Sequence, residues 1–242
     1  MIPSLSIVQF KSMSGLEKIL IDLAQNSRNL CVFDLDSTLF NVSPRTQRIL
    51  HEFADIYHQD LKTIQIEASD WGLKEPLIRH GYSLEQHTEM HQSLRDLWVE
   101  RFFSNDYIHY DVPYAGAVSF VQKLSTVSKN NIYYLTGRDV ARMEKGTYEV
   151  LKKWGFPIQA NSVQLKPHRS MEDHLFKRDW ILDLQSKNPD STIYLFENEP
   201  VNINFIGLTT KNIKIVYLDT THSRKEQVSV PTIKVTDFRK GV

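Results

Sequence analysis

The chain has 242 residues, and its 29 lysine and arginine residues balance its 29 aspartate and glutamate residues, so no overall field draws it to nucleic acid or to an anionic membrane surface. Its single cysteine, Cys31, excludes an internal disulfide and is typical of a reducing compartment. The first ten residues lack the pattern of a secretion signal and no run approaches about twenty apolar residues, so we expect a soluble cytoplasmic protein without a membrane span.

Five short apolar runs, rich in β-branched and aromatic residues, predict buried strands at residues 30–33, 131–135, 162–165, 192–196 and 213–218. Residues 228–235 are a candidate for an additional strand. Helical spacing of apolar side chains separates most of these runs. It is carried by Ala117, Phe120, Val121 and Leu124, by Met143, Thr147, Val150, Leu151 and Trp154, and by Leu175, Trp180 and Leu182. This alternation predicts an α/β fold with a Rossmann-like parallel sheet core and helices on both faces.

One interval, from Asn41 to Asp111, interrupts the alternation with apolar residues at helical spacings and no convincing strand. It predicts an all-helical cap at residues 41–110, inserted into a core of residues 1–40 and 111–242. Because the insertion leaves the core directly after a pair of aspartates, we expect the cap to cover them. The core of the cap is expected to include the aromatic residues Trp71, Tyr82, Trp98, Phe102 and Phe103.

The pair of aspartates, Asp34 and Asp36, stands at the end of the first predicted strand. Alternate side chains of an extended segment point the same way, so both carboxylates face one side while Leu35 faces the core. Leaving two such charges unpaired would be costly. The spacing therefore predicts a bound cation, a shared proton, or both.

Other strand ends carry polar residues that should meet these aspartates at one edge of the sheet. Thr136 can donate to an anion, and Gly137 lets a backbone N–H approach phosphate oxygens closely. Glu197 adds a third carboxylate, which completes an all-oxygen set suited to Mg²⁺. Two lysines are candidates to grip a phosphoryl oxygen, namely Lys166 at the third strand end and Lys177 in the helix that follows.

Some of these residues have a second interpretation. Arg138 is equally consistent with a substrate contact and with a structural ion pair. His87 and His91 are four residues apart and could ligate zinc, but no third ligand accompanies them at a recognisable spacing, which favours a solvated helix face.

Taken in order, these motifs resemble those of the haloacid dehalogenase (HAD)-like hydrolase superfamily, in its phosphatase branch with a helical cap inserted after the first motif. The matching residues are Asp34-x-Asp36-x-Thr38, Thr136-Gly137-Arg138, a lysine, and Glu197-Asn198. Lys177 is favoured as the lysine, because a Thr-Gly-Arg motif and a Gly-Phe-Pro helix end often accompany a lysine that opens the helix before the fourth strand; Lys166 remains the alternative.

The resemblance implies a role for each residue. Asp34 would attack phosphorus to form an aspartyl-phosphate, and Asp36 would protonate the leaving oxygen and then activate water. Thr136, Gly137 and Lys177 would bind the phosphoryl oxygens. Asp34, Asp36 through its backbone carbonyl, and Glu197 would hold Mg²⁺. Glu197 departs from the aspartate that is usual in the fourth motif, and its extra methylene bears on metal affinity.

The resulting hypothesis is an enzyme, a Mg²⁺-dependent phosphohydrolase that hydrolyses a phosphomonoester of a small soluble metabolite. The alternatives are a phosphotransferase or a nucleotidase that uses the same aspartates, and a non-catalytic phosphate-binding protein of the same fold. We expect neither a membrane nor a nucleic acid as partner. The choice of substrate should lie in the cap, because the core handles only the phosphoryl group.

Overall fold

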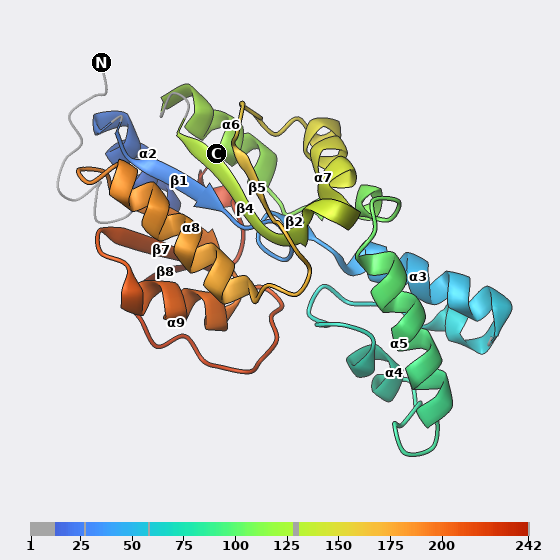
Figure 1. The fold of residues 1–242 in the computed structure, drawn as a ribbon. Coiled ribbons are helices and arrows are strands. Elements are labelled where there is room, and N and C mark those ends of the chain that lie inside the picture. The colour runs from blue at the N-terminus through green and yellow to red at the C-terminus, as the bar shows by residue number, and fades with distance from the viewer. Residues whose placement is uncertain (1–12, 27, 58, 128–130, 242) are drawn as a thin grey trace.

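The computed structural model describes residues 13–26, 28–57, 59–127 and 131–241, so the expectation for the first ten residues concerns a segment outside this range. In the described part of the chain, six strands form one parallel sheet in the order β5-β4-β1-β6-β7-β8 (Figure 1). The strands are β1 (Leu30–Phe33), β4 (Ile132–Asp139), β5 (Val163–Lys166), β6 (Ile193–Glu197), β7 (Ile213–Leu218) and β8 (Thr232–Val235). The predicted α/β fold with a Rossmann-like parallel sheet is confirmed, including the additional strand near the C-terminus.

Helices cover both faces of this sheet, because alternate residues of each strand are apolar on both sides. In β1, Cys31 and Phe33 pack toward one face and Leu30 and Val32 toward the other. The first face is covered by α2 (Gly15–Gln25), α6 (Ala117–Val127) and α7 (Val140–Trp154). The second is covered by α8 (Asp173–Lys187) and α9 (Pro200–Thr209).

The side of helix α8 that faces the sheet differs from the prediction, which placed Leu175, Trp180 and Leu182 on the buried side. Leu175 and Leu182 are each 37% exposed, whereas Lys177, Ile181 and Leu184 are buried. The buried residues follow one another at intervals of four and three, which is the spacing of a single helix face. A lysine is therefore part of the stripe that faces the core.

Strand β4 also differs from the prediction, because it continues through the Thr-Gly-Arg sequence to Asp139 instead of ending at residue 135. The side chain of Asp139 then accepts from the backbone N–H of Arg142 and caps α7. The motif thus lies on an extended strand and not in a turn.

The described residues between Asn41 and Asp111 are helical, as expected, with the elements α3 (Ser43–Ile56), η1 (Gln59–Thr63), α4 (Lys74–Arg79), α5 (Thr88–Phe102) and η2 (Ile108–Tyr110). Figure 1 shows α3, α4 and α5 together beyond the end of the sheet to which the β1 arrow points. They share a hydrophobic cluster that includes Leu50, Phe53, Leu77 and Leu94. Trp71 was expected in this cluster but is 48% exposed.

Two-residue strands join the two ends of this interval. β2 (Phe40–Asn41) and β3 (Val112–Pro113) form an antiparallel pair, so the chain enters and leaves the cap at the same place. Among the helices that the structure describes, none combines the length and apolar character that crossing a bilayer requires.

Buried ion pairs hold this junction to the core. Arg45, in the first turn of α3, donates through Nε to Asp111 Oδ1 at 2.8 Å, and Asp111 immediately precedes β3. Arg138 of β4 donates to the other carboxylate oxygen of Asp111 at 2.7 Å. All three side chains are almost completely buried. Asp111 therefore neutralises one guanidinium from the cap and one from the core.

We predict that Asp111→Asn lowers the free energy of unfolding by about 3 to 5 kcal/mol, because it leaves two buried guanidinium groups short of a counterion. Urea denaturation followed by circular dichroism measures the change. The control is Asp183→Asn, which removes a pair with Lys187 whose side chains are both more than half exposed and should cost less than about 1 kcal/mol. Equal effects of the two substitutions would contradict the assigned role of Asp111.

Candidate active site

The candidate site lies at the carboxyl edge of the sheet, where β1 and β6 end side by side and β4 runs on past the end of β1. Phe33 of β1 pairs with Tyr134 of β4 and with Phe196 of β6. The residues that follow are therefore adjacent in space, and the backbone N–H of Asp34 donates to the carbonyl of Phe196 at 3.0 Å. Parallel register thus brings the first, second and fourth sequence motifs to one edge.

Lys177 bridges two buried carboxylates at this edge. Its Nζ lies 2.6 Å from Asp34 Oδ1 and 2.7 Å from Glu197 Oε2, and each of the three side chains is at most 6% exposed. Burial alone lowers the pKa of the Lys177 ammonium, but the charges of Asp34 and Glu197 outweigh it and raise the pKa. The lysine is therefore a permanent cation beside Asp34.

The carboxylate of Glu197 is fully engaged by its surroundings. Its Oε1 accepts from the backbone N–H groups of Asn198 and Glu199, both at 3.0 Å. Its Oε2 accepts from Lys177 and, at 3.3 Å, from the side-chain amide of Asn202. The extra methylene relative to aspartate places this carboxylate against Lys177 and the start of α9.

Asp36 is held between two arginines. Arg138 donates to both carboxylate oxygens, with Nε 3.2 Å from Oδ2, and Arg45 donates to Oδ1 at 3.1 Å. Burial alone would raise the pKa of Asp36, but these guanidinium groups outweigh it and hold the pKa well below its usual range. Arg138 also binds Asp111 and Thr147, so the structure shows the ion-pair role of Arg138.

Asp34 has the opposite electrostatic environment. Burial, followed by the charge of Glu197, raises the pKa of Asp34 to about 7, although Lys177 opposes the rise. The two aspartates are thus two residues apart and differ in their affinity for a proton. Ser37, which follows them, has a φ of 62°, in the left-handed region, and this turns the chain between Asp36 and Thr38.

The second motif contributes the hydroxyl of Thr136 and, at Gly137, a position without a side chain. Thr136 is buried, and its Oγ1 accepts from the backbone N–H of Arg138 at 3.3 Å, which leaves the hydroxyl proton to donate. Gly137 lies against the carboxylate of Asp173, the first residue of α8, and a Cβ at position 137 would be 2.8 Å from Asp173 Cγ. Lys166 pairs with Asp173, at 2.5 Å, and not with Asp34.

A chain of hydrogen bonds links the site to the cap. Thr38 Oγ1 donates to the side chain of Asn198 at 3.0 Å, and Asn198 donates to the carbonyl of Thr221 at 2.7 Å. Thr221 Oγ1 donates in turn to the carbonyl of Ser69, in the loop before α4, at 3.1 Å. Arg224 reaches the same carbonyl, so the loop after β7 and the cap are in direct contact.

A magnesium ion fits this edge in charge and in ligand type. Among the described residues the edge carries one more carboxylate than cations. The carboxylates are those of Asp34, Asp36, Asp111, Asp173 and Glu197, and the cations are Lys166, Lys177, Arg45 and Arg138. No described residue donates a hydrogen bond to the second oxygen of Asp34, whereas Glu197 would have to give up a hydrogen bond to bind a metal. Asp34 is thus the side chain best suited to hold Mg²⁺.

Among the described residues, no group of three or more histidine, cysteine, aspartate or glutamate side chains is arranged to hold a metal ion. His87 and His91 in particular face main-chain carbonyls. The ring nitrogens lie 3.2 Å from Ser83 O and 3.0 Å from Tyr82 O. Both side chains are half-buried against the main chain, so they do not form the solvated helix face that the sequence favours.

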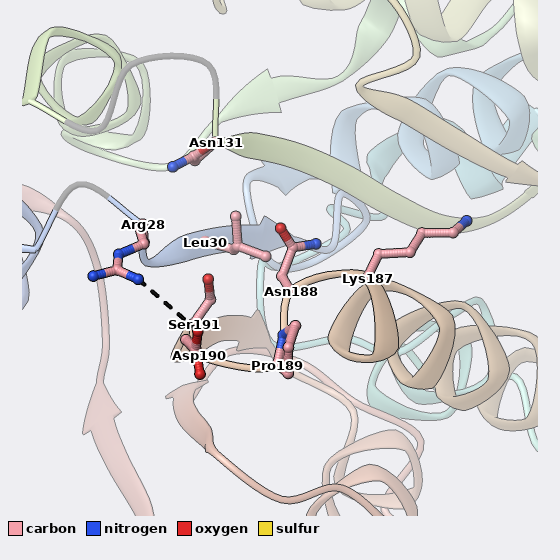
Figure 2. Close-up of a pocket in the computed structure, with 8 residues that line it drawn as sticks. All are labelled: Arg28, Leu30, Asn131, Lys187, Asn188, Pro189, Asp190 and Ser191. Atoms are coloured by element: carbon pink, nitrogen blue, oxygen red, sulfur yellow. Dashed lines mark ion pairs between the residues drawn. The ribbon is translucent and has the colours of Figure 1, made fainter.

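A separate hollow lies at the opposite edge of the sheet (Figure 2). It is bordered by Leu30, the first residue of β1, by Asn131, which precedes β4, and by the segment that leads from α8 into β6. Arg28 and Asp190 form an exposed ion pair across it, 3.9 Å apart. No residue of the candidate site borders this hollow.

Arg45 and Asp111 were not among the site residues that the sequence analysis singled out. Both lie in or beside the polar cap segment, and they are 66 positions apart in the chain, so no local pattern connects them. Lys177 was selected by resemblance, but a direct signal was also present. It shares a spacing of four and three residues with Ile181 and Leu184, and a lysine in an apolar stripe requires a buried partner.

No protein-family model matches the sequence, and no curated protein is significantly similar to it. Solved structures are similar in three dimensions. A protein of Burkholderia xenovorans LB400, assigned to the haloacid dehalogenase-like hydrolases, is 18% identical, with a TM-score of 0.53 over 88% of this chain and 93% of its own. Protein tyrosine kinase A (PtkA) of Mycobacterium tuberculosis is 12% identical, with a TM-score of 0.53 over 88% of this chain and 95% of its own. The predicted resemblance is thus confirmed at the level of fold, and the chain has the α/β fold of the haloacid dehalogenase-like hydrolases.

Proposed function

We propose that this protein is a Mg²⁺-dependent phosphatase that hydrolyses a phosphomonoester of a small soluble metabolite through an aspartyl-phosphate. The observation that carries the proposal is the contact of Lys177 with Asp34 inside a buried set of carboxylates at the carboxyl edge of the sheet. Thr136, two residues beyond the position of β4 that pairs with Phe33, supplies a hydroxyl donor at the same edge. A nucleophile, a cation and a donor for phosphoryl oxygens are thus combined.

In the first step, a carboxylate oxygen of Asp34 forms a bond to phosphorus while the bond from phosphorus to the leaving oxygen breaks. Lys177 opposes the uptake of a proton by Asp34 and uses two of its three N–H groups on Asp34 and Glu197. The third N–H is available for an oxygen of the transferring phosphoryl group. In the second step, water attacks the aspartyl-phosphate and releases phosphate and Asp34.

Asp36 is the proposed proton carrier, and its environment affects the two steps differently. Arg138 and Arg45 keep it ionised, so it is ready to take a proton from the attacking water in the second step. To donate a proton to the leaving oxygen in the first step, it must first be protonated against the pull of both guanidinium groups. Leaving groups that need little protonation, such as aryl oxygens, should therefore react fastest.

Mg²⁺ would be held by Asp34 and the backbone carbonyl of Asp36, with Glu197 nearby, and when bound it would reduce the repulsion between Asp34 and the phosphate. Substrate choice would rest with the cap, whose loop before α4 contacts the loop after β7 through Ser69 and Thr221. A closed arrangement of this kind favours a small substrate. Product analysis with and without an alcohol acceptor distinguishes hydrolysis from phosphotransfer, and a panel of nucleotides tests the nucleotidase alternative.

We expect the purified protein to hydrolyse 4-nitrophenyl phosphate with added Mg²⁺, and Asp34→Asn to abolish the reaction, because an amide is not a carboxylate nucleophile. Release of nitrophenolate is the measurement, and excess EDTA should stop the wild-type reaction. Asp183→Asn, an exposed aspartate of α8, serves as the control and should keep full activity. Full activity of Asp34→Asn would overturn the mechanism.

The two lysines should differ in kinetic effect. Lys177→Ala should lower kcat about 10² to 10³-fold, because it removes the cation beside the reacting group. Lys166→Ala should raise KM and leave kcat closer to that of the wild type, since Lys166 contacts Asp173 and not Asp34. Circular dichroism of both variants separates loss of folding from loss of chemistry. A larger loss of kcat in Lys166→Ala than in Lys177→Ala would show that Lys166, and not Lys177, is the lysine beside the reacting group.

Asp36→Asn should reduce kcat by about two to four powers of ten, the usual contribution of a general acid or base. It should still bind inorganic phosphate, which isothermal titration calorimetry measures. Because the substitution also removes a counterion of Arg45 and Arg138, urea denaturation must accompany the assay. Wild-type turnover in a folded Asp36→Asn protein would exclude Asp36 as proton carrier.

A further inference from the structure

Asp173 is a carboxylate in an unusual place. It is the first residue of α8 and lies four positions before Lys177, so it extends the stripe of Lys177, Ile181 and Leu184 by one turn toward the strand ends. Its carboxylate fills the gap beside Gly137, where a Cβ would overlap it. The second motif, whose glycine lets a phosphate oxygen approach the backbone, is thus already in contact with an anionic group.

Two lysines interact with this carboxylate. Lys166 Nζ lies 2.5 Å from Asp173 Oδ1 and donates a second hydrogen bond to the carbonyl of Met171 at 3.0 Å. Lys177 is close enough to be affected by the charge. Burial lowers the pKa of Lys177, but the charges of Asp34, Glu197 and Asp173 together raise it. The Asp173 carboxylate beside Gly137 therefore interacts with two lysines. Lys177 contacts Asp34, the proposed nucleophile, and Lys166 does not.

Exposure distinguishes Asp173 from the other carboxylates of the edge. Its side chain is 51% exposed, whereas those of Asp34 and Glu197 are 6% and 1% exposed. Asp173 can consequently turn into solvent at little cost, while Asp34 and Glu197 cannot leave. Lys166 is 9% exposed and would remain at the site without its partner.

We propose that the Asp173 carboxylate occupies, in the ligand-free protein, the position beside Gly137 that an oxygen of the phosphate group takes, so that phosphate must displace Asp173 and thereby gains Lys166 as a contact. This inference rests on the proposed function, because it concerns the same site. Asp173 is an internal competitor of the substrate, and Lys166 is a phosphate-binding residue that Asp173 covers. Binding exchanges one anion for another at Lys166 and adds no unpaired charge.

The test is the affinity for inorganic phosphate, measured by isothermal titration calorimetry with Mg²⁺ present, for wild-type protein, Asp173→Asn and the control Asp183→Asn. Asp183 lies on the same helix and is similarly exposed, at 55%, but it pairs with Lys187 far from the strand ends. Asp173→Asn should bind phosphate about tenfold more tightly, because a like charge within a few ångströms of the anion is removed. The control should bind as the wild type does. Unchanged or weaker binding by Asp173→Asn would overturn the proposal.

The contribution of Lys166 is tested in the Asp173→Asn background. Adding Lys166→Ala should remove the gain in phosphate affinity, since the released lysine is then absent. If the double variant keeps the gain, Lys166 is not a phosphate contact and that part of the proposal is wrong. In the nitrophenyl phosphate assay, Asp173→Asn should lower KM and leave kcat nearly unchanged. Loss of a purely structural ion pair would not change KM alone.

The outcomes for binding and for hydrolysis separate the two proposals. Hydrolysis by the wild type together with equal phosphate affinities of wild type and Asp173→Asn would refute the displacement and leave the phosphatase function intact. Tighter phosphate binding by Asp173→Asn without hydrolysis by any variant would support the displacement and refute the function. Absence of phosphate binding in every variant would refute the displacement, and absence of hydrolysis by the wild type as well would refute both.

Discussion

Neutralisation of buried carboxylates is the constraint on which the candidate site depends. A carboxylate that leaves water needs a cation or several hydrogen bonds, or it takes up a proton. Asp34 and Glu197 share Lys177, which comes from a helix of the core, and Asp36 and Asp111 share Arg45 and Arg138. Each cation serves two carboxylates, so the loss of any one of them affects two acids.

The two groups of charges perform different tasks. The group around Lys177 lies entirely in the core, at the end of β1 and on α8 and β6, and places a cation beside the buried proposed nucleophile. The group around Asp36 joins β4 to both ends of the cap, because Arg45 begins α3 and Asp111 precedes β3. Asp36 therefore contacts a residue of the cap directly, whereas Asp34 pairs with Lys177 of the core.

The sequence predicted the architecture because apolar runs of strand length alternate with helical spacing, and because parallel strands bring their carboxyl ends to one edge. That rule alone placed Asp34, Thr136 and Glu197 together. It did not reveal which side of α8 faces the sheet, since Leu175 and Leu182 are apolar and exposed while Lys177 is charged and buried. Helix α2 was overlooked, although Ser14 and Glu17 form a capping box that the sequence displays. The partners of Asp36 could not be inferred, because Arg45 and Arg138 stand in no local pattern with it.

The antiparallel pair of β2 and β3 has a consequence for how the chain folds. Asp36 and Arg138 are 102 positions apart, and most of the intervening chain is the cap. The entropy of closing a loop depends on its effective length, and contacts between distant residues slow folding. Once Phe40 pairs with Pro113 and Asn41 with Val112, the cap is excluded from that loop. Strand β1 then reaches β4 across a shorter effective loop, and the entropy of closing the cap segment falls on the formation of the β2–β3 pair.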